Sequence, residues 1–313
     1  MTNNILFGDC RDTLKTLDVK ARMCVTSPPY YGLRDYGGEA NQIGQEDTPE
    51  KFIENLVDVF RSVRDVLTDD GTLWVNIGDS YYNYRPGKGQ ALVKQTLSKT
   101  DRDQPQDCPR RGNKLDGLKE KDLIGIPWML AFALRADGWY LRQDIIWHKP
   151  NPMPESVRDR CTKSHEYLFL LSKNKRYYYD NEAIKEPVKQ DWGTRDRTDG
   201  KYHNTGTGLQ PHSGLTKSYT TKNKRSVWSI TNKPYKGAHF AVFPPDLIEP
   251  CILAGSEEGD IILDPFMGTG TTAMVAKKHN RNYIGCELHE DYASLQTDRI
   301  DSVPTPLPAI IWK

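Results

Sequence analysis

Short apolar runs alternate along this chain with segments of helical periodicity, and this alternation limits the fold most strongly. The apolar runs lie at 21–27, 71–79, 139–150, 166–173, 260–266 and 282–288. The helical segments lie at 49–67, 244–255 and 269–280. Continuous apolar runs are typical of parallel strands buried on both faces, and their alternation with helices predicts an α/β doubly wound fold. In such a fold we expect ligands at the loops that follow the carboxyl ends of strands.

Composition narrows the class of protein. The chain has 313 residues and a net charge of +1, and no run approaches the ~18 apolar residues of a membrane helix. The N-terminus, MTNNILFGDC, lacks the basic and apolar regions of a signal peptide. Six cysteines are scattered without a CxxC pair, which argues against a metal site or a disulfide framework. We expect a soluble, cytoplasmic protein without metal.

Two stretches are locally basic. Residues 81–119 carry 9 Lys and Arg against 4 Asp and Glu, and residues 155–235 carry 16 against 9. Both are rich in Gly, Thr and Pro, which predicts long loops. Composition alone leaves two alternatives open, a solvated insertion and a surface that contacts phosphates.

The stretch LDPFMGTGTTAMVAKK, at 263–278, predicts a strand, a tight turn and a helix. The strand ends at Asp264, and the turn contains Gly268 and Gly270, which allow a ligand to approach the backbone. The next strand ends at Glu287, at a spacing that suits hydrogen bonds to ribose hydroxyls. No lysine follows the second glycine, and the dinucleotide fingerprint is incomplete. An adenosine ligand without a pyrophosphate fits better, while the alternative is a plain strand-to-helix turn.

A second loop, at 24–37, holds the sequence Ser27-Pro28-Pro29-Tyr30 after a strand. The two prolines fix φ and remove two backbone donors, so the loop is stiff and its carbonyls are free to accept. It would project the Ser27 hydroxyl, the Pro28 carbonyl and the Tyr30 ring together. The alternative is a stiff turn with a packing tyrosine.

SPPY together with DPFMGTGTT resembles the DNA amino-methyltransferases, which methylate cytosine or adenine amino groups with S-adenosylmethionine. The order of the motifs is similar to the β-type arrangement of that family. The resemblance implies a Rossmann-like α/β fold with permuted motif order and an inserted target-recognition region. It divides the chain into a catalytic half (1–154, with a basic loop at 81–119), a target-recognition region (155–235) and a cofactor-binding half (236–313).

The resemblance also implies residue roles. It places these residues at the cofactor: Asp9, Asp264, Phe266, Gly268, Gly270, Thr271 and Glu287. Glu287 would take the ribose hydroxyls. For Asp9, a helix N-cap is an equal alternative. Thr271 would donate to the carboxylate of the cofactor or cap the helix.

The catalytic loop would act on the amino group of an extruded base. Ser27 Oγ and the Pro28 carbonyl would accept its two hydrogens, so that the lone pair turns toward the methyl donor. Tyr30 is the expected stacking partner of the flipped base. Trp147 is either a second wall of the base pocket or a core residue. Arg110 and Arg111 are expected to contact DNA phosphates.

Three other functions would leave different signs in the sequence. Carbon-5 methylation needs a thiolate, and Cys251 follows Pro250, but it lies in an apolar helical stripe that predicts a core position. A non-catalytic homologue that binds nucleic acid is disfavoured by the intact motifs. Related loops with Asn before Pro-Pro-Tyr act on glutamine amides or RNA, whereas Ser27 and the basic stretches favour DNA.

The resemblance also bears on the target base and on the partners. Within the resembled family Ser at position 27 tends to accompany cytosine N4, and Asp tends to accompany adenine N6, so cytosine N4 is favoured and adenine N6 stays open. We expect double-stranded DNA as the partner, a cognate restriction endonuclease as a further possibility, and a monomer or weak dimer. The host would be a bacterial, archaeal or phage-infected cell.

Overall fold

The computed structural model describes residues 2–32, 42–82, 115, 117–188, 220–232 and 243–304. The strands are β1 (Asn4–Phe7), β2 (Ala21–Thr26), β3 (Leu67–Ile77), β4 (Tyr140–His148), β5 (His165–Ser172), β6 (Glu186–Pro187), β7 (Thr221–Lys222), β8 (Val227–Ser229), β9 (Ile261–Asp264) and β10 (Asn282–Glu287). The helices are α1 (Cys10–Thr13), α2 (Pro49–Val66), α3 (Ile126–Ala136), α4 (Pro245–Gly255), α5 (Thr271–Lys278) and α6 (Ala293–Asp301), with 3₁₀ turns η1 (Leu14–Thr16) and η3 (Glu290–Tyr292).

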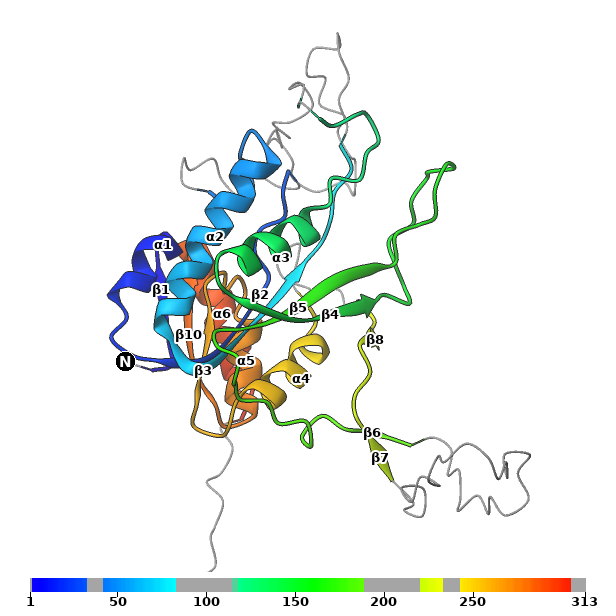
Figure 1. Cartoon of the computed structure of the whole chain (residues 1–313). Helices are drawn as coiled ribbons and strands as arrows, with labels where there is room; N and C mark the ends of the chain where they lie inside the picture. The colour runs from blue at the N-terminus through cyan, green and yellow to red at the C-terminus, as the bar shows by residue number, and fades with distance from the viewer. Residues whose placement is uncertain are drawn as a thin grey trace, which may run out of the picture.

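Eight strands form one sheet in the order β1-β10-β9-β2-β3-β5-β4-β8, and β6 and β7 form a separate antiparallel pair (Figure 1). All strands of the large sheet run the same way except β5, which is antiparallel to both β3 and β4. The expectation of parallel strands is therefore wrong for 166–173. The chain passes from β4 to β5 without a helix, so it returns beside β4 in the opposite direction.

Helices cover both faces of the sheet and enclose two apolar cores. Helices α1, α2 and α3 pack on one face, and α4 and α5 pack on the other, with α6 against α5 (Figure 1). The three helices expected from periodicity correspond to α2, α4 and α5. Helix α2 shows why such a segment folds as it does: Thr48 caps its N-terminus, Pro49 occupies the first turn, and its apolar stripe is buried.

The order of the strands confirms the doubly wound α/β fold. The chain proceeds from β9 to β10 toward one edge of the sheet and from β2 to β3 toward the other, so the winding reverses between the neighbours β9 and β2. In open α/β sheets this switch point is where ligands bind. The range 155–235, expected as a separate target-recognition region, contributes β5 and β8 to the main sheet.

No helix within the described ranges is long and apolar enough to cross a membrane.

Candidate active site

The strand pairings collect the predicted site residues along one edge of the sheet. The pairs Phe7–Glu287, Thr26–Val75 and Trp147–Glu166 lie at or next to the strand ends on that edge. Because β5 runs in reverse, its first residues reach the edge where the other strands end. In sheet order, the residues at this edge are Asp9, Glu287, Asp264, Ser27, Asp79, Glu166 and Trp147. The cofactor motif therefore lies on one side of Ser27, and the end of β3, β5 and β4 lies on the other.

The Ser27–Tyr30 loop is fixed to the protein by the residue that follows it. Tyr31 is 2% exposed, and its ring packs against Phe52 of α2 with 5.4 Å between centroids. The Ser80 hydroxyl donates to the Tyr31 carbonyl at 3.1 Å. With Pro28 also buried, the loop is a rigid support for Ser27 and Tyr30.

The Tyr30 side chain turns toward β3 and β5. Its hydroxyl donates to Glu166 Oε2 at 2.7 Å, and Glu166 Oε1 accepts from Lys149. The ring lies over Gly78, where an added Cβ would stand 2.6 Å from a ring carbon. Only glycine at position 78 leaves space for the ring in this place.

The glycine turn after β9 adopts left-handed backbone conformations, with φ of +52° at Gly268 and +80° at Gly270. Gly268 N–H donates to Glu287 Oε2 at 2.8 Å, and His289 N–H donates to Oε1 at 3.0 Å. Burial raises the pKa of Glu287 to about 7, although these backbone donors oppose the shift. Within the described residues His289 Nε2 is buried without a hydrogen-bond partner.

These features fit an adenosine cofactor. The turn presents backbone at the start of α5, while Glu287 and His289 supply polar atoms on the neighbouring strand end. No lysine lies in the turn to bind a phosphate.

Asp264 is 1% exposed and bonds to protein atoms on three sides. The hydroxyls of Thr26 and Thr272 each donate to it at 2.6 Å, and Phe266 N–H donates at 3.0 Å. Burial raises the pKa of Asp264 to about 6, against the effect of these donors. The carboxylate thus connects β2, β9 and α5 at the switch point, and it fixes Thr26, the residue directly before Ser27.

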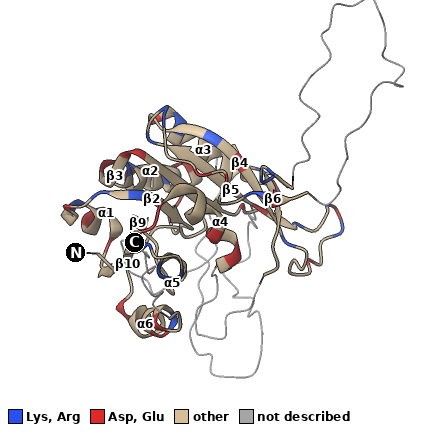
Figure 2. Ribbon diagram, turned by 90° about the horizontal axis from the view of Figure 1, so that it is seen from below, with Lys and Arg blue, Asp and Glu red and all other residues tan. Residues whose placement is uncertain are grey.

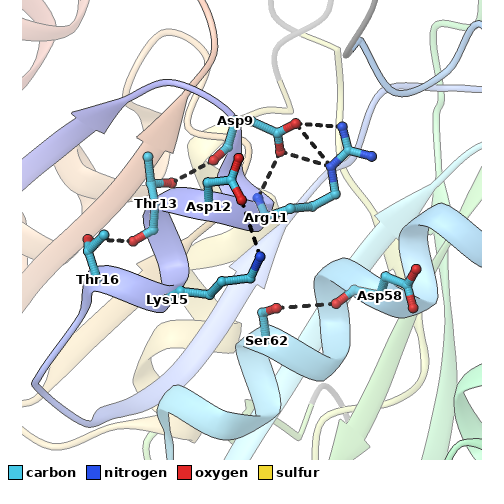
Figure 3. A network of polar contacts seen from close by, with 8 residues as sticks. All are labelled: Asp9, Arg11, Asp12, Thr13, Lys15, Thr16, Asp58 and Ser62. Carbon is cyan, nitrogen blue, oxygen red and sulfur yellow. Dashed lines mark hydrogen bonds and ion pairs between the residues drawn. The ribbon is translucent and has the colours of Figure 1, made fainter.

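Asp9 follows β1 and caps α1 by accepting from Arg11 N–H at 2.8 Å (Figure 3). The Arg11 guanidinium also contacts the carboxylate, at 2.5 Å from Nη2 to Oδ2. Burial alone would raise the pKa of Asp9, but the side-chain and backbone hydrogen bonds from Arg11, with the charges of Arg11 and Lys15, together hold the pKa below its ordinary value. The N-cap expected as one alternative is therefore present. It directly follows Gly8, whose N–H donates to the Glu287 carbonyl at 2.8 Å, at the end of the adjacent strand β10.

Of the other residues singled out in the sequence, three are buried in the described structure and two lie outside it. Trp147 is 4% exposed, belongs to the core beneath α4 and donates from Nε1 to the Ile230 carbonyl at 2.9 Å, which favours its packing role. Cys251 is fully buried in α4, and this confirms its core position. Thr271 is buried at the first position of α5, whose N-cap is Gly270. Arg110 and Arg111 lie outside the described residues.

Sequence reasoning did not single out Glu166, Lys149 or Thr26 as site residues. Glu166 and Lys149 lie at the ends of apolar runs, which was an available signal. Assigning them to the site required the direction of β5, and periodicity does not give the direction of a strand.

Comparison with known proteins decides the family. A family model described as DNA methylase, N6_N4_Mtase, matches residues 21–298. The chain belongs to this family. It is a DNA methyltransferase that depends on S-adenosylmethionine.

Two curated relatives match the methyltransferase over nearly its whole length. The type II methyltransferase M.SmaI of Serratia marcescens is 49% identical, over 95% of this chain and 90% of its own. M.Cfr9I of Citrobacter freundii is 46% identical, over 95% and 87%. Both are named as type II methyltransferases.

Solved structures share the fold of this methyltransferase. The PvuII DNA methyltransferase, described as cytosine-N4-specific, aligns with a TM-score of 0.62 at 16% identity, over 100% of this chain and 89% of its own. M1.HpyAVI in complex with SAM aligns with a TM-score of 0.53 at 17% identity, over 95% and 98%.

Proposed function

We propose that this methyltransferase transfers a methyl group to the exocyclic N4 of cytosine in double-stranded DNA, after extruding the base. The observation that carries the proposal is the position of Ser27. It follows β2 directly, between the glycine turn after β9 and the Tyr30–Glu166 contact near β3 and β5.

Two carbonyl or hydroxyl oxygens suffice to direct the amino group. Ser27 Oγ and the Pro28 carbonyl would accept its hydrogens, which turns the nitrogen lone pair toward the cofactor. S-adenosylmethionine supplies an activated methyl carbon when bound. The rate then depends on positioning and on preorganised acceptors, and no covalent intermediate with the enzyme is needed.

The cofactor would lie across β1, β10 and β9. Glu287 would accept from the ribose hydroxyls, and Asp9 would lie near the adenine amino group. The backbone of Phe266 to Gly270 and the start of α5, including Thr271, would surround the methionine part. Asp264 would act indirectly, because its oxygens already accept from Thr26, Thr272 and Phe266.

Cytosine N4 is favoured over adenine N6 because position 27 is Ser. A neutral hydroxyl is a weaker acceptor than a carboxylate and suits a site that relies on geometry. The PvuII methyltransferase, which its name assigns to cytosine N4, shares the fold of this chain. Nucleoside mass spectrometry of DNA methylated by the purified protein tests the assignment. We expect N4-methylcytosine, and N6-methyladenine as the only product would refute it.

Further parts of the proposal concern DNA recognition and the cellular setting. We place target recognition in the part of 155–235 between β5 and β8, with the halves 1–154 and 236–313 around it. Phosphate contacts are assigned to Arg110 and Arg111 in the basic stretch 81–119. A cytoplasmic location and a monomer or weak dimer complete the proposal. A cognate restriction endonuclease is proposed as well, and the type II names of the relatives support it.

A further inference from the structure

The hydroxyl of Tyr30 is held by an acidic residue from a distant part of the chain. Glu166 lies at the start of β5, 136 residues away, and its Oε2 accepts from Tyr30 at 2.7 Å. Asn76 of β3 lies behind this contact, with its amide 3.4 Å from both Tyr30 and Glu166 and its Nδ2 bonded to the Tyr167 carbonyl at 3.1 Å. The Tyr30–Glu166 hydrogen bond therefore links the loop after β2 to the start of β5, next to Asn76 of the intervening strand β3.

Glu166 is itself fixed in place. Its second oxygen accepts from Lys149, and both side chains of this ion pair are only 16% exposed. Lys149 Nζ also lies 4.2 Å from the centroid of the Trp147 ring. The ion pair with Lys149 thus holds the Glu166 carboxyl group in place as the acceptor for the Tyr30 hydroxyl.

The ring of Tyr30 is therefore restrained at two places. Gly78 supports the ring from below, and Glu166 holds the hydroxyl at its far end. The backbone before the ring is stiff because Pro28 and Pro29 precede it. With both restraints, the tilt of the ring is fixed before any base arrives.

We propose that Glu166 is a positioning residue for methyl transfer, which sets the orientation of the Tyr30 ring against which the extruded base stacks. The proposal rests on the stacking role given to Tyr30 above. Misplacement of a stacked base by about 1 Å costs up to 100-fold in rate, so a freely tilting ring would slow the chemical step more than it weakens DNA binding.

A double-mutant cycle tests this proposal. The assay measures single-turnover transfer of labelled methyl groups from S-adenosylmethionine to genomic DNA. It compares three single variants, Glu166→Gln, Glu166→Ala and Tyr30→Phe, with the two double variants that combine Tyr30→Phe with each Glu166 change. We expect each single variant to lose roughly 10- to 100-fold in rate, the range for a hydrogen bond to a charged group. In the Tyr30→Phe background the Glu166 changes should cost little more, because the bond is already absent.

Separate measurements distinguish positioning from structural support. Affinity for S-adenosylhomocysteine and the melting temperature should stay close to those of the wild type in Tyr30→Phe and Glu166→Gln. Glu249→Gln is the control, because Glu249 forms an ion pair with Lys278 between α4 and α5, outside the contacts of Tyr30 and Glu166. It should leave the transfer rate unchanged.

If the fold-loss in transfer rate of a double variant equals the product of the losses of its two single variants, the proposal is overturned, since Glu166 would then act independently of Tyr30. A loss of cofactor affinity in parallel with rate would overturn it as well. If Glu166→Ala does not fold, Glu166→Gln with Tyr30→Phe still decides the question. An inactive wild type or an N6-methyladenine product would contradict the proposed function instead, so the two failures are distinct.

Discussion

Glu287 lies at the end of β10 with a pKa raised to about 7 by burial, so near neutral pH part of the protein carries it protonated. Ribose hydroxyls that donate to the carboxylate would favour its ionised form. We therefore expect binding of S-adenosylhomocysteine near pH 7 to release a fraction of a proton, and the affinity to rise between pH 6 and pH 8. Calorimetry in buffers of different ionisation enthalpy measures this release.

Glu287→Gln is the control for the proton release. The amide cannot titrate, so binding to this variant should be weaker and should release no proton from this site. An unchanged proton count in the variant would remove Glu287 from the cofactor site.

Gly78 offers a second change at the scale of one residue. An added Cβ would lie 2.6 Å from Tyr30 Cε2, and the ring cannot move aside without straining its bond to Glu166. We expect Gly78→Ala to lower the methyl-transfer rate by about tenfold or more while S-adenosylhomocysteine binds normally, because only the base side of the edge is disturbed. Equal single-turnover rates for variant and wild type would show that the ring position is not critical.

At the scale of elements, Asp264 joins β2, β9 and α5, and its titration affects stability. In the unfolded chain an aspartate has a pKa of about 3.9, whereas the folded value is about 6. The fold thus disfavours the ionised form of Asp264, which lowers the unfolding free energy wherever the group is ionised. This loss of stability is absent below about pH 4, grows as the pH rises to about 6, and is constant above that pH. The unfolding free energy should fall over this window by at most about 3 kcal/mol.

Urea denaturation between pH 4 and pH 7 measures that fall, with Asp264→Asn as the comparison. Glu287 adds a decline in the same direction up to about pH 7, so the difference between wild type and variant is the informative quantity. A difference that does not change with pH would mean that Asp264 stays ionised at no cost.

The elements also show how much of the fold can be predicted from the sequence. Apolar runs locate β2, β3, β9 and β10, because a strand that is buried on both faces is a continuous apolar run bounded by polar residues. The same property hides direction, which is why β5 was expected to be parallel. The site residues divide in the same way. Ser27 and Gly268 stand in motifs that follow their strands and Glu287 ends its strand, whereas Glu166 joins them only because β5 runs in reverse. Its role depends on a contact 136 residues apart, which local patterns do not encode.

At the scale of the whole molecule, charge governs the encounter with DNA. The basic stretch 81–119 lies mostly outside the described residues, and its content of Lys and Arg predicts phosphate contacts. Replacing Arg110 and Arg111 together with Gln should reduce the slope of log K against log salt by roughly 2, which is about 0.9 for each lost contact. Fluorescence anisotropy at several salt concentrations measures the slope.

Arg61 provides the matched control for that experiment. It lies on α2, where it pairs with Asp58 and Asp137. In Figure 2 the ribbon around α2 and α3 carries both blue (Lys, Arg) and red (Asp, Glu) stretches. Arg61→Gln should not change the slope. If Arg110 and Arg111 behave like Arg61, they belong to the solvated surface.

The pairing of β1 with β10 and of β2 with β9 has a consequence for synthesis on the ribosome. These contacts join residues about 240 to 280 positions apart, so the cofactor side of the sheet cannot close until β9 and β10 have been made. Contacts of such long sequence separation form slowly, and the N-terminal strands must wait for their partners. A nascent chain that has emerged only as far as β8 carries Ser27 and Tyr30 but no glycine turn. Under the proposed function, methyl transfer would therefore begin only with chains that are translated through β10.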